Sequence, residues 1–198
     1  GANKAQKMRG PNFYFVLTNT SFDMISEKMI QSLNNQIALE GYASFLYLSM
    51  ACWCEDQGLA GCAAFMHRQS GEERNHKLRI INYLHEMGAK AIVPGIPQPP
   101  ADFESIRSLF DQVYAHEQKV TRSIYELINQ ANAEQDHSTL HFLQWYVAEQ
   151  REEENLMRSL MDRIRLIGEG PMSLYYIDKE VESINKAQQA AEAEEGGE

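Results

Sequence analysis

The chain has 198 residues, 43% of them hydrophobic, which is enough for one globular domain with a sizeable core. Its formal net charge of −10 argues against nucleic acid as a partner and favours dissolved cations. Because no run of apolar residues approaches the roughly 18 that a membrane-spanning helix needs, we expect no membrane partner.

Residues 1–23 precede the first helical pattern, and their apolar run from Phe13 to Leu17 is too short for the core of a signal peptide. We expect these residues to be an added leader, and the alternative is a native extension that packs on the outside of the domain. Residues 24–190 should form a single domain, and residues 191–198 an acidic, flexible tail.

Apolar residues recur at alternating steps of three and four along most of the chain, which predicts helices that bury one face. Four long helices are expected, over residues 26–54, 59–87, 103–132 and 137–167, followed by a shorter fifth over 173–190. The first and third breaks are short enough only for antiparallel hairpins. The second, from Gly88 to Asp102, is proline-rich, and its reach of ~45 Å as extended chain spans the ~43 Å length of a helix. This connectivity predicts an all-α four-helix bundle with one long crossover.

Three cysteines lie close together along the chain: Cys52, Cys54 and Cys62. Their spacing does not fit a zinc site, and the sequence offers no second pair to complete four ligands. We therefore interpret them as reduced thiols, which indicates a reducing compartment such as the cytoplasm.

The apolar residues of each long helix form a stripe along one face, and each of these four stripes carries ionisable or amide side chains at its middle. In chain order these are Glu40, Glu73 with His76, Glu117, and Gln150 with Glu153. Counting along antiparallel neighbours places them at one height, and Glu40 and Glu73 both lie ~21 Å from their shared turn. Buried carboxylates at this density need a counter-charge, and no lysine or arginine on the stripes provides one. The sequence therefore predicts a shared metal site.

The residue types of this site indicate which metal it would take. Glu73 and His76 stand three residues apart and so project from one helix face. Oxygen and nitrogen ligands without a thiolate favour iron or manganese over copper or structural zinc. Carboxylates combined with Glu-x-x-His are the ligand pattern of di-iron four-helix bundles. The fourth helix has Gln150-Arg151-Glu152-Glu153 and no second histidine, so we expect two inequivalent metals, with the one lacking imidazole held more weakly.

Around these positions the chain resembles a bacterial non-haem ferritin, over about residues 24–190. The resemblance rests on five segments: Ala38–Tyr42, Gly71–His76, Tyr114–Gln118, Phe142–Glu154 and Leu174–Glu180. It implies a ferritin-like fold with a short fifth C-terminal helix, assembled into a hollow homo-oligomeric shell of 24 subunits in the cytoplasm. It also implies that Fe(II) is oxidised with dioxygen or hydrogen peroxide at a di-iron ferroxidase centre and stored inside as a ferric mineral.

The resemblance also implies roles for individual residues. One iron would be held by Glu40, Glu73 and His76, and the other by Glu73 as a bridge, Glu117, and Glu153 or Gln150. Tyr47 would stand beside the pair as a donor of a hydrogen bond or an electron, and the alternative is an ordinary core tyrosine. Haem is not expected, because Arg74 and Glu153 stand where haem-binding members have methionine and histidine.

A third iron site is implied as well. Its matching positions are Glu72, Glu149, Glu152 and Glu153. The first three stand next to the apolar stripe rather than in it, so an acidic face in contact with solvent is an equally good interpretation.

Two other classes of function remain open at this stage. A di-iron enzyme acting on an organic substrate or on peroxide usually has a further pocket or a cysteine-rich electron-transfer module, and neither is apparent in the sequence. A metal-free shell that displays residues 1–23 as cargo would need no centre at all. Particle mass and iron content after loading distinguish these classes from storage.

Overall fold

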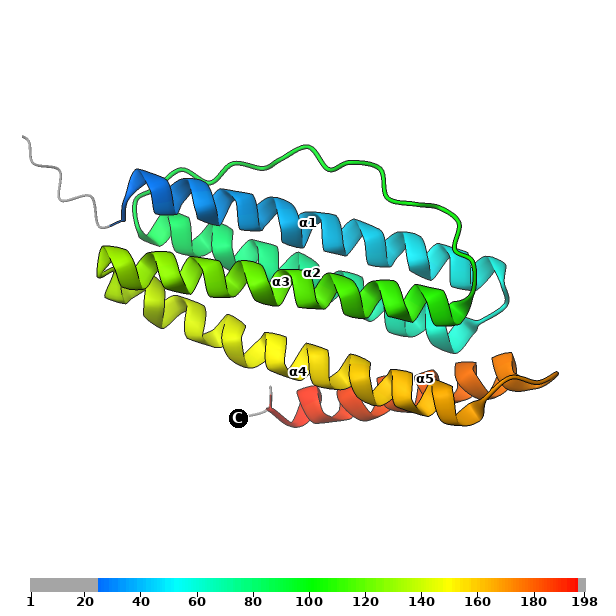
Figure 1. The fold of residues 1–198 in the computed structure, drawn as a ribbon. Coiled ribbons are helices and arrows are strands. Elements are labelled where there is room, and N and C mark those ends of the chain that lie inside the picture. Colours follow the sequence, from blue (N-terminus) through cyan, green and yellow to red (C-terminus); the bar gives the residue numbers. More distant parts are fainter. Residues whose placement is uncertain (1–24, 196–198) are drawn as a thin grey trace, which may run out of the picture.

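The fold is described for residues 25–195 by a computed structural model, and the expected leader, residues 1–23, lies outside that range. This part of the chain forms helices and contains no strand (Figure 1). The helices are α1 (Glu27–Asp56), α2 (Ala60–Glu86), α3 (Ile106–Glu134), α4 (His137–Ile167) and α5 (Ser173–Glu195). The predicted all-α bundle and its order of helices are thus confirmed.

Most helix ends lie within two residues of the predicted ones, and the two larger differences, at the start of α3 and the end of α5, have local reasons. The hydroxyls of Ser26 and Ser105 cap α1 and α3, each accepting a hydrogen bond from the backbone N–H three residues on, at 3.0 and 3.1 Å. Because of this cap, α3 begins at Ile106 rather than at residue 103. At the other end of the chain, α5 continues to Glu195 rather than to residue 190, because its last residues are the strong helix formers alanine and glutamate.

The long crossover between α2 and α3 runs along the outside of α1 (Figure 1). Asn34 on α1 accepts a hydrogen bond from the backbone N–H of Ile92 at 2.7 Å and donates one to the carbonyl of Lys90 at 3.1 Å. Farther along α1, the Ser49 hydroxyl donates to the carbonyl of Pro100 at 2.6 Å. These bonds hold the crossover to α1, so that α3 starts at the same end of the bundle as α2.

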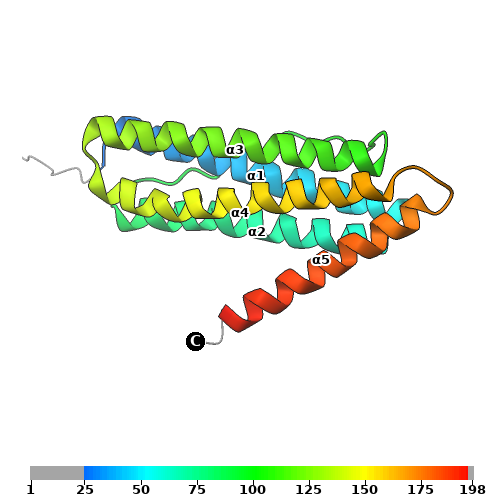
Figure 2. The same ribbon diagram turned by 60° about the horizontal axis from the view of Figure 1, so that its bottom comes forward.

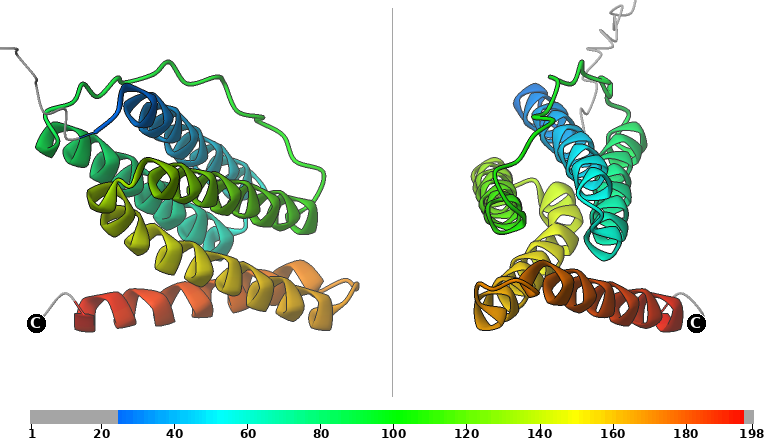
Figure 3. Two further views of the ribbon diagram at one scale, coloured as in Figure 1. Left: turned by 60° about the vertical axis from the view of Figure 1, so that its left-hand side comes forward. Right: turned by 90° about the vertical axis from the view of Figure 1, so that its right-hand side faces the viewer.

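Helix α5 leaves the end of α4 and crosses the bundle at an angle, over the start of α2 (Figures 2 and 3). The two backbones approach closely at Gly61, where an added Cβ would lie 2.4 Å from the carbonyl oxygen of Asp178. The Asp178 carboxylate accepts a hydrogen bond from the backbone N–H of Cys62 at 2.9 Å. Farther along, Arg68 of α2 donates to the Asn185 side chain at 2.7 Å, so α5 is attached to α2 at two levels.

The apolar core of the bundle is divided into two clusters by a band of polar residues. One cluster is built around Phe65 and Phe110, and the other around Leu84 and Tyr146. Along α1, the second cluster ends at Ile37 and the first begins at Ala43, and the other three bundle helices are interrupted at the same level. The band coincides with the middle of the stripes, which is where the sequence predicts a shared site.

Among the described residues, α1 is the one helix with the length and apolar character of a membrane span, because an 18-residue stretch of it has a mean hydropathy of 1.2. The core helix of a bundle has the same composition, and the apolar side of α1 is packed here against its neighbours: Met29, Leu33, Ile37 and Met50 are all 0% exposed. By composition alone, α1 therefore contradicts the expectation that no segment is apolar enough to span a membrane. Packing of its apolar face inside the bundle explains that composition.

Candidate metal centre

The polar band contains every predicted ligand of the two-metal site. These residues are Glu40 on α1, Glu73 and His76 on α2, Glu117 on α3, and Gln150 and Glu153 on α4. All six side chains are buried, with exposed fractions from 0% to 5%. Four helices thus direct carboxylate, amide and imidazole groups into one level of the core, where water cannot solvate them.

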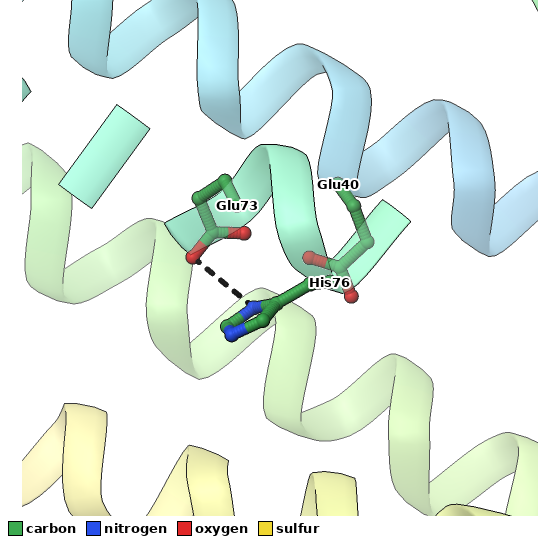
Figure 4. A group of neighbouring side chains, drawn as sticks. All are labelled: Glu40, Glu73 and His76. Carbon is green, nitrogen blue, oxygen red and sulfur yellow. Dashed lines mark ion pairs between the residues drawn. The ribbon is translucent and has the colours of Figure 1, made fainter. Parts of the chain in front are cut away.

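Three of these residues form a cluster that has the geometry of a metal site. Glu40, Glu73 and His76 each offer one ligand atom, and these atoms lie within 4.8 Å of one another (Figure 4). Four atoms of the cluster are buried without a hydrogen-bond partner in residues 25–195: Oε2 of Glu40, Oε1 and Oε2 of Glu73, and Nδ1 of His76. Buried polar atoms are nearly always hydrogen-bonded, so a concentration of unpartnered acceptors indicates a place for a cation.

The imidazole of His76 is fixed from several sides. Its Nδ1 lies 3.6 Å from Oε1 of Glu73, and its Nε2 lies 3.7 Å from Oε1 of Glu149 on α4. The ring also makes an edge contact with the Trp145 ring, at a centroid distance of 5.4 Å. Tyr146 donates a hydrogen bond to the backbone carbonyl of His76 at 2.7 Å. With Nε2 directed at Glu149, Nδ1 is the ring nitrogen that faces Glu73 of the cluster.

Glu117 on α3 is held through both carboxylate oxygens. The Tyr47 hydroxyl donates to Oε1, and Nε2 of Gln150 donates to Oε2 at 3.2 Å. Tyr47 is fully buried, so its predicted position beside the site agrees with the structure, while its role stays a prediction. Oε1 of Gln150 is buried without a hydrogen-bond partner in the described part of the chain, so it remains available as a ligand.

Carboxamides hold two further carboxylates of the centre. Nε2 of Gln69 donates to Oε2 of Glu153 at 2.9 Å, and Nε2 of Gln36 donates to Oε1 of Glu40 at 2.8 Å. Glu73 differs from the other carboxylates, because neither of its oxygens accepts a hydrogen bond from any described residue. Both oxygens of Glu73 are therefore free to bind cations.

Electrostatics give a second reason to expect a cation here. Burial, with the neighbouring carboxylates, raises the pKa of the carboxyls of Glu73, Glu117 and Glu153. Burial alone would lower the pKa of His76, but Glu149 and Glu73 outweigh it and raise that pKa. Within residues 25–195, no lysine or arginine forms an ion pair with the buried carboxylates. The charges must therefore be neutralised by protons or by metal, and metal binding would release those protons.

The residues predicted for a third metal site lie near this centre but do not converge on one point. Glu72 forms an ion pair with Arg68, and Glu149 faces the imidazole of His76. The side chain of Glu152 is 72% exposed and lies 3.9 Å from Arg151. The third site therefore stays a prediction.

Comparisons with known proteins identify the family. The family model of the ferritin-like domain matches residues 30–167. The chain belongs to the ferritin family. Over 162 residues this ferritin is 41% identical to the bacterial non-heme ferritin of Escherichia coli O6:H1, a match that covers 82% of the chain and 98% of that protein. It is 38% identical, with the same coverage, to a probable bacterial non-heme ferritin-like protein of Haemophilus influenzae.

A solved structure agrees with the sequence comparisons. An open pore ferritin from the hyperthermophilic archaeon Archaeoglobus fulgidus matches this ferritin with a TM-score of 0.78 at 41% identity. The match covers 81% of this chain and 98% of the archaeal one. The family resemblance inferred from the sequence segments is thus confirmed.

Sequence reasoning missed the second layer of the centre in this ferritin. Gln36 stands one helical turn before Glu40, and this spacing of four residues was the available signal. Gln69 stands four residues before Glu73 on α2, but its partner Glu153 comes from another helix, so no local spacing indicates this bond. Trp145 packs on His76 from α4, and no local spacing reveals that contact.

Proposed function

We propose that this ferritin stores iron and that its buried centre is a ferroxidase site, where Fe(II) is the substrate and dioxygen or hydrogen peroxide the oxidant. One observation carries the proposal: the unpartnered, buried ligand atoms of Glu40, Glu73 and His76 converge within 4.8 Å. Membership of the ferritin family supports iron as the metal. Oxygen ligands with a single imidazole and no thiolate suit iron as well.

We assign two iron positions to this centre. The first is bound by Glu40, Glu73 and His76. The second is bound by Glu73 as a bridge, by Glu117, and by Glu153 or Gln150. Glu73 suits the bridging position because neither of its oxygens is engaged by a donor in residues 25–195. The second position has no imidazole, so we expect weaker binding there and loss of its ferric ion to the mineral.

The chemistry follows from holding two ferrous ions side by side. Each Fe(II) gives up one electron, and dioxygen takes up both electrons with two protons to form hydrogen peroxide. With hydrogen peroxide as the oxidant, the same two electrons and two protons give two molecules of water. A paired site therefore avoids the release of a one-electron reduced oxygen species. Tyr47, which donates a hydrogen bond to Glu117, orients that ligand.

Storage requires a shell, and the surface of the chain supports assembly with further copies. Large apolar side chains are exposed on α1 and the crossover, including Phe45, Ile92 and Val93. A second group lies where α4 passes into α5: Leu166, Met172, Leu174, Tyr175 and Tyr176. Exposed apolar groups of this size mark interaction surfaces. We propose a homo-oligomeric shell of 24 subunits that encloses the ferric mineral.

We also propose that the protein works in the cytoplasm. Cys52, Cys54 and Cys62 are all free thiols, and two of them are buried. Burial raises the pKa of Cys54 to about 12, so that thiol stays neutral and unreactive. Reduced cysteines of this kind are typical of reducing compartments.

The ferroxidase assignment is tested by Glu73→Ala. Oxidation of Fe(II) is followed by absorbance at two irons per subunit, in the assembled protein. Loss of the bridging ligand should lower the initial rate by more than the ~10–100-fold that follows removal of a hydrogen-bond partner of a metal ligand. Glu86→Ala, an exposed residue of the same helix, is the matched control and should keep the wild-type rate. An unchanged rate in Glu73→Ala refutes the assignment of the centre.

Storage is tested separately, by particle mass and iron content after repeated additions of Fe(II). A large hollow particle that accumulates hundreds of irons supports the proposal. A small oligomer that retains only its two bound irons per subunit would instead indicate an enzyme acting on another substrate. A shell that forms but does not oxidise Fe(II) would indicate a structural cage.

A further inference from the structure

A chain of hydrogen bonds connects the metal centre to the surface of α3. Gln36 is 1% exposed, and its Nε2 donates to Oε1 of Glu40 at 2.8 Å. Its other end, Oε1, accepts a hydrogen bond from the hydroxyl of Ser123 on α3 at 2.5 Å. Ser123 is half-buried, so this chain, which we call the Ser123–Gln36 relay, spans the distance from the centre to the edge of the bundle.

The direction of this relay is set by charge. An ionised carboxylate can only accept hydrogen bonds, so Glu40 requires the amide nitrogen of Gln36 on its side. The amide oxygen must then face Ser123, whose hydroxyl becomes the donor. With the amide reversed, the amide oxygen of Gln36 would face the carboxylate oxygen of Glu40, and neither oxygen could donate a hydrogen bond. Each member thereby fixes the orientation of the next.

The relay forms a hydrogen bond with one carboxylate oxygen of Glu40 and leaves the other oxygen without one. Oε1 accepts from Gln36, whereas Oε2 is buried with no hydrogen-bond partner among the described residues. The ligand atom of Glu40 lies within 4.8 Å of those of Glu73 and His76. A carboxylate held through one oxygen keeps a single rotamer and presents the other oxygen at a constant position.

We propose that Gln36 and Ser123 are positioning residues of the metal centre, and that their relay holds Oε1 of Glu40 so that Oε2 faces the first metal. This inference rests on the proposed metal-binding function of the centre. Neither residue touches the metal. Partners of this kind change metal affinity by ~10–100-fold when they are removed.

The structure contains a second relay of the same composition that serves as an internal control. Ser32 on α1 donates to Oε1 of Gln130 on α3 at 2.8 Å, and Nε2 of Gln130 donates to Oε1 of Glu134 at 2.9 Å. The two relays join the same pair of helices, and both have a glutamine four residues before the glutamate. Glu134 lies at the end of α3, and its second oxygen accepts from the Ser26 hydroxyl. This control relay therefore has the same chemistry without the metal centre.

The test is binding of Co²⁺ to the assembled, metal-free protein, followed by calorimetry and by the visible absorption of the bound ion. Gln36→Met keeps the length of the side chain and removes the amide, and we expect a ~10–100-fold loss of Co²⁺ affinity at the first position with a changed visible spectrum. Ser123→Ala should change both readouts in the same direction, and Ser123→Thr, which keeps the hydroxyl, should restore them. Gln130→Met and Ser32→Ala, in the control relay, should bind Co²⁺ as the wild type does.

These measurements distinguish a positioning role of the two residues from a purely structural one. Thermal unfolding of the metal-free variants measures the packing that each substitution removes, separately from any effect on Co²⁺ binding. If Gln36→Met and Ser123→Ala keep the Co²⁺ affinity and spectrum of the wild type, the relay does not position Glu40. If Gln36→Met does not assemble, the comparison of Ser123→Ala with Ser123→Thr decides the question.

Failure of the proposed function would look different. In that case the wild-type protein itself would bind no Co²⁺ at the centre. Wild-type binding together with unchanged binding in the variants refutes the relay alone.

Discussion

The metal-free protein should become more stable when Glu117 is replaced by the neutral Glu117→Gln. Burial raises the pKa of this carboxyl from its ordinary value of 4.5 to about 7. At pH 8 the buried charge therefore costs about 3 kcal/mol, since one pKa unit corresponds to ~1.4 kcal/mol. A glutamine cannot accept from both Tyr47 and Gln150 through two oxygens, so one hydrogen bond, worth ~1 kcal/mol, is lost. The net gain is about 2 kcal/mol.

The sign of the pH dependence follows from proton counting. Between pH 4.5 and 7 the folded protein holds a proton on Glu117 that the unfolded chain has released. Stability of the wild type therefore falls as the pH rises through this window. The advantage of Glu117→Gln should be largest at pH 8 and should disappear toward pH 5, where both states of the wild type are increasingly protonated.

The assay is unfolding monitored by circular dichroism in the presence of a chelator, at pH 5 and pH 8. A gain of 2 kcal/mol corresponds to a rise in Tm of ~4–8 °C for a domain of this size. Glu126→Gln, an exposed position on the same helix, should leave Tm unchanged. Saturating Co²⁺ should reverse the order, because the wild type then gains more from the metal. A Glu117→Gln variant that is less stable than the wild type in chelator at pH 8 would refute the view that repulsion between buried charges destabilises the empty centre.

Three further predictions concern other parts of the protein. Tyr47→Phe, which removes the donor to Glu117, should slow Fe(II) oxidation and leave the number of bound Co²⁺ ions unchanged, and an undiminished rate would assign Tyr47 to packing alone. Phe110→Ala empties a fully buried site and should lower the free energy of unfolding in guanidinium by ~3–5 kcal/mol, so a loss below ~1 kcal/mol would contradict the packing described for that cluster. Glu152→Gln should leave the initial oxidation rate at two irons per subunit unchanged, because its side chain is 72% exposed, and a severalfold decrease would show that Glu152 binds one of the first two irons.

The sequence predicted which polar side chains meet in the buried band, because that information is local and periodic. An apolar stripe interrupted by Glu40 on one helix and by Glu117 on another already implies a buried polar level, and helix geometry converts residue counts into heights. The division of the core into two clusters has the same origin, because apolar residues such as Ile37 and Ala43 lie on either side of the polar residues of α1. The long crossover followed likewise from its length and its prolines.

The amide partners of the centre could not be predicted in the same way. The bond from Gln69 to Glu153 depends on how α2 and α4 are rotated about their axes, and a rotation of one residue would separate the two groups. The link from Ser123 to Gln36 depends similarly on the packing of α3 against α1. Helix ends such as Glu195 were also missed, because alanine and glutamate continue a helix without the apolar spacing on which the prediction relied.

The connectivity of the bundle divides the ligands between two halves of the chain. The hairpin of α1 and α2 contributes Glu40, Glu73 and His76, whereas the hairpin of α3 and α4 contributes Glu117 and the α4 ligands. The first proposed metal position therefore has all its ligands within one hairpin, whereas the second, with Glu73 as its proposed bridge, needs residues from both hairpins. A metal bound at the second position would link the two hairpins, so we expect the contact between them to be firmer with that metal than without it.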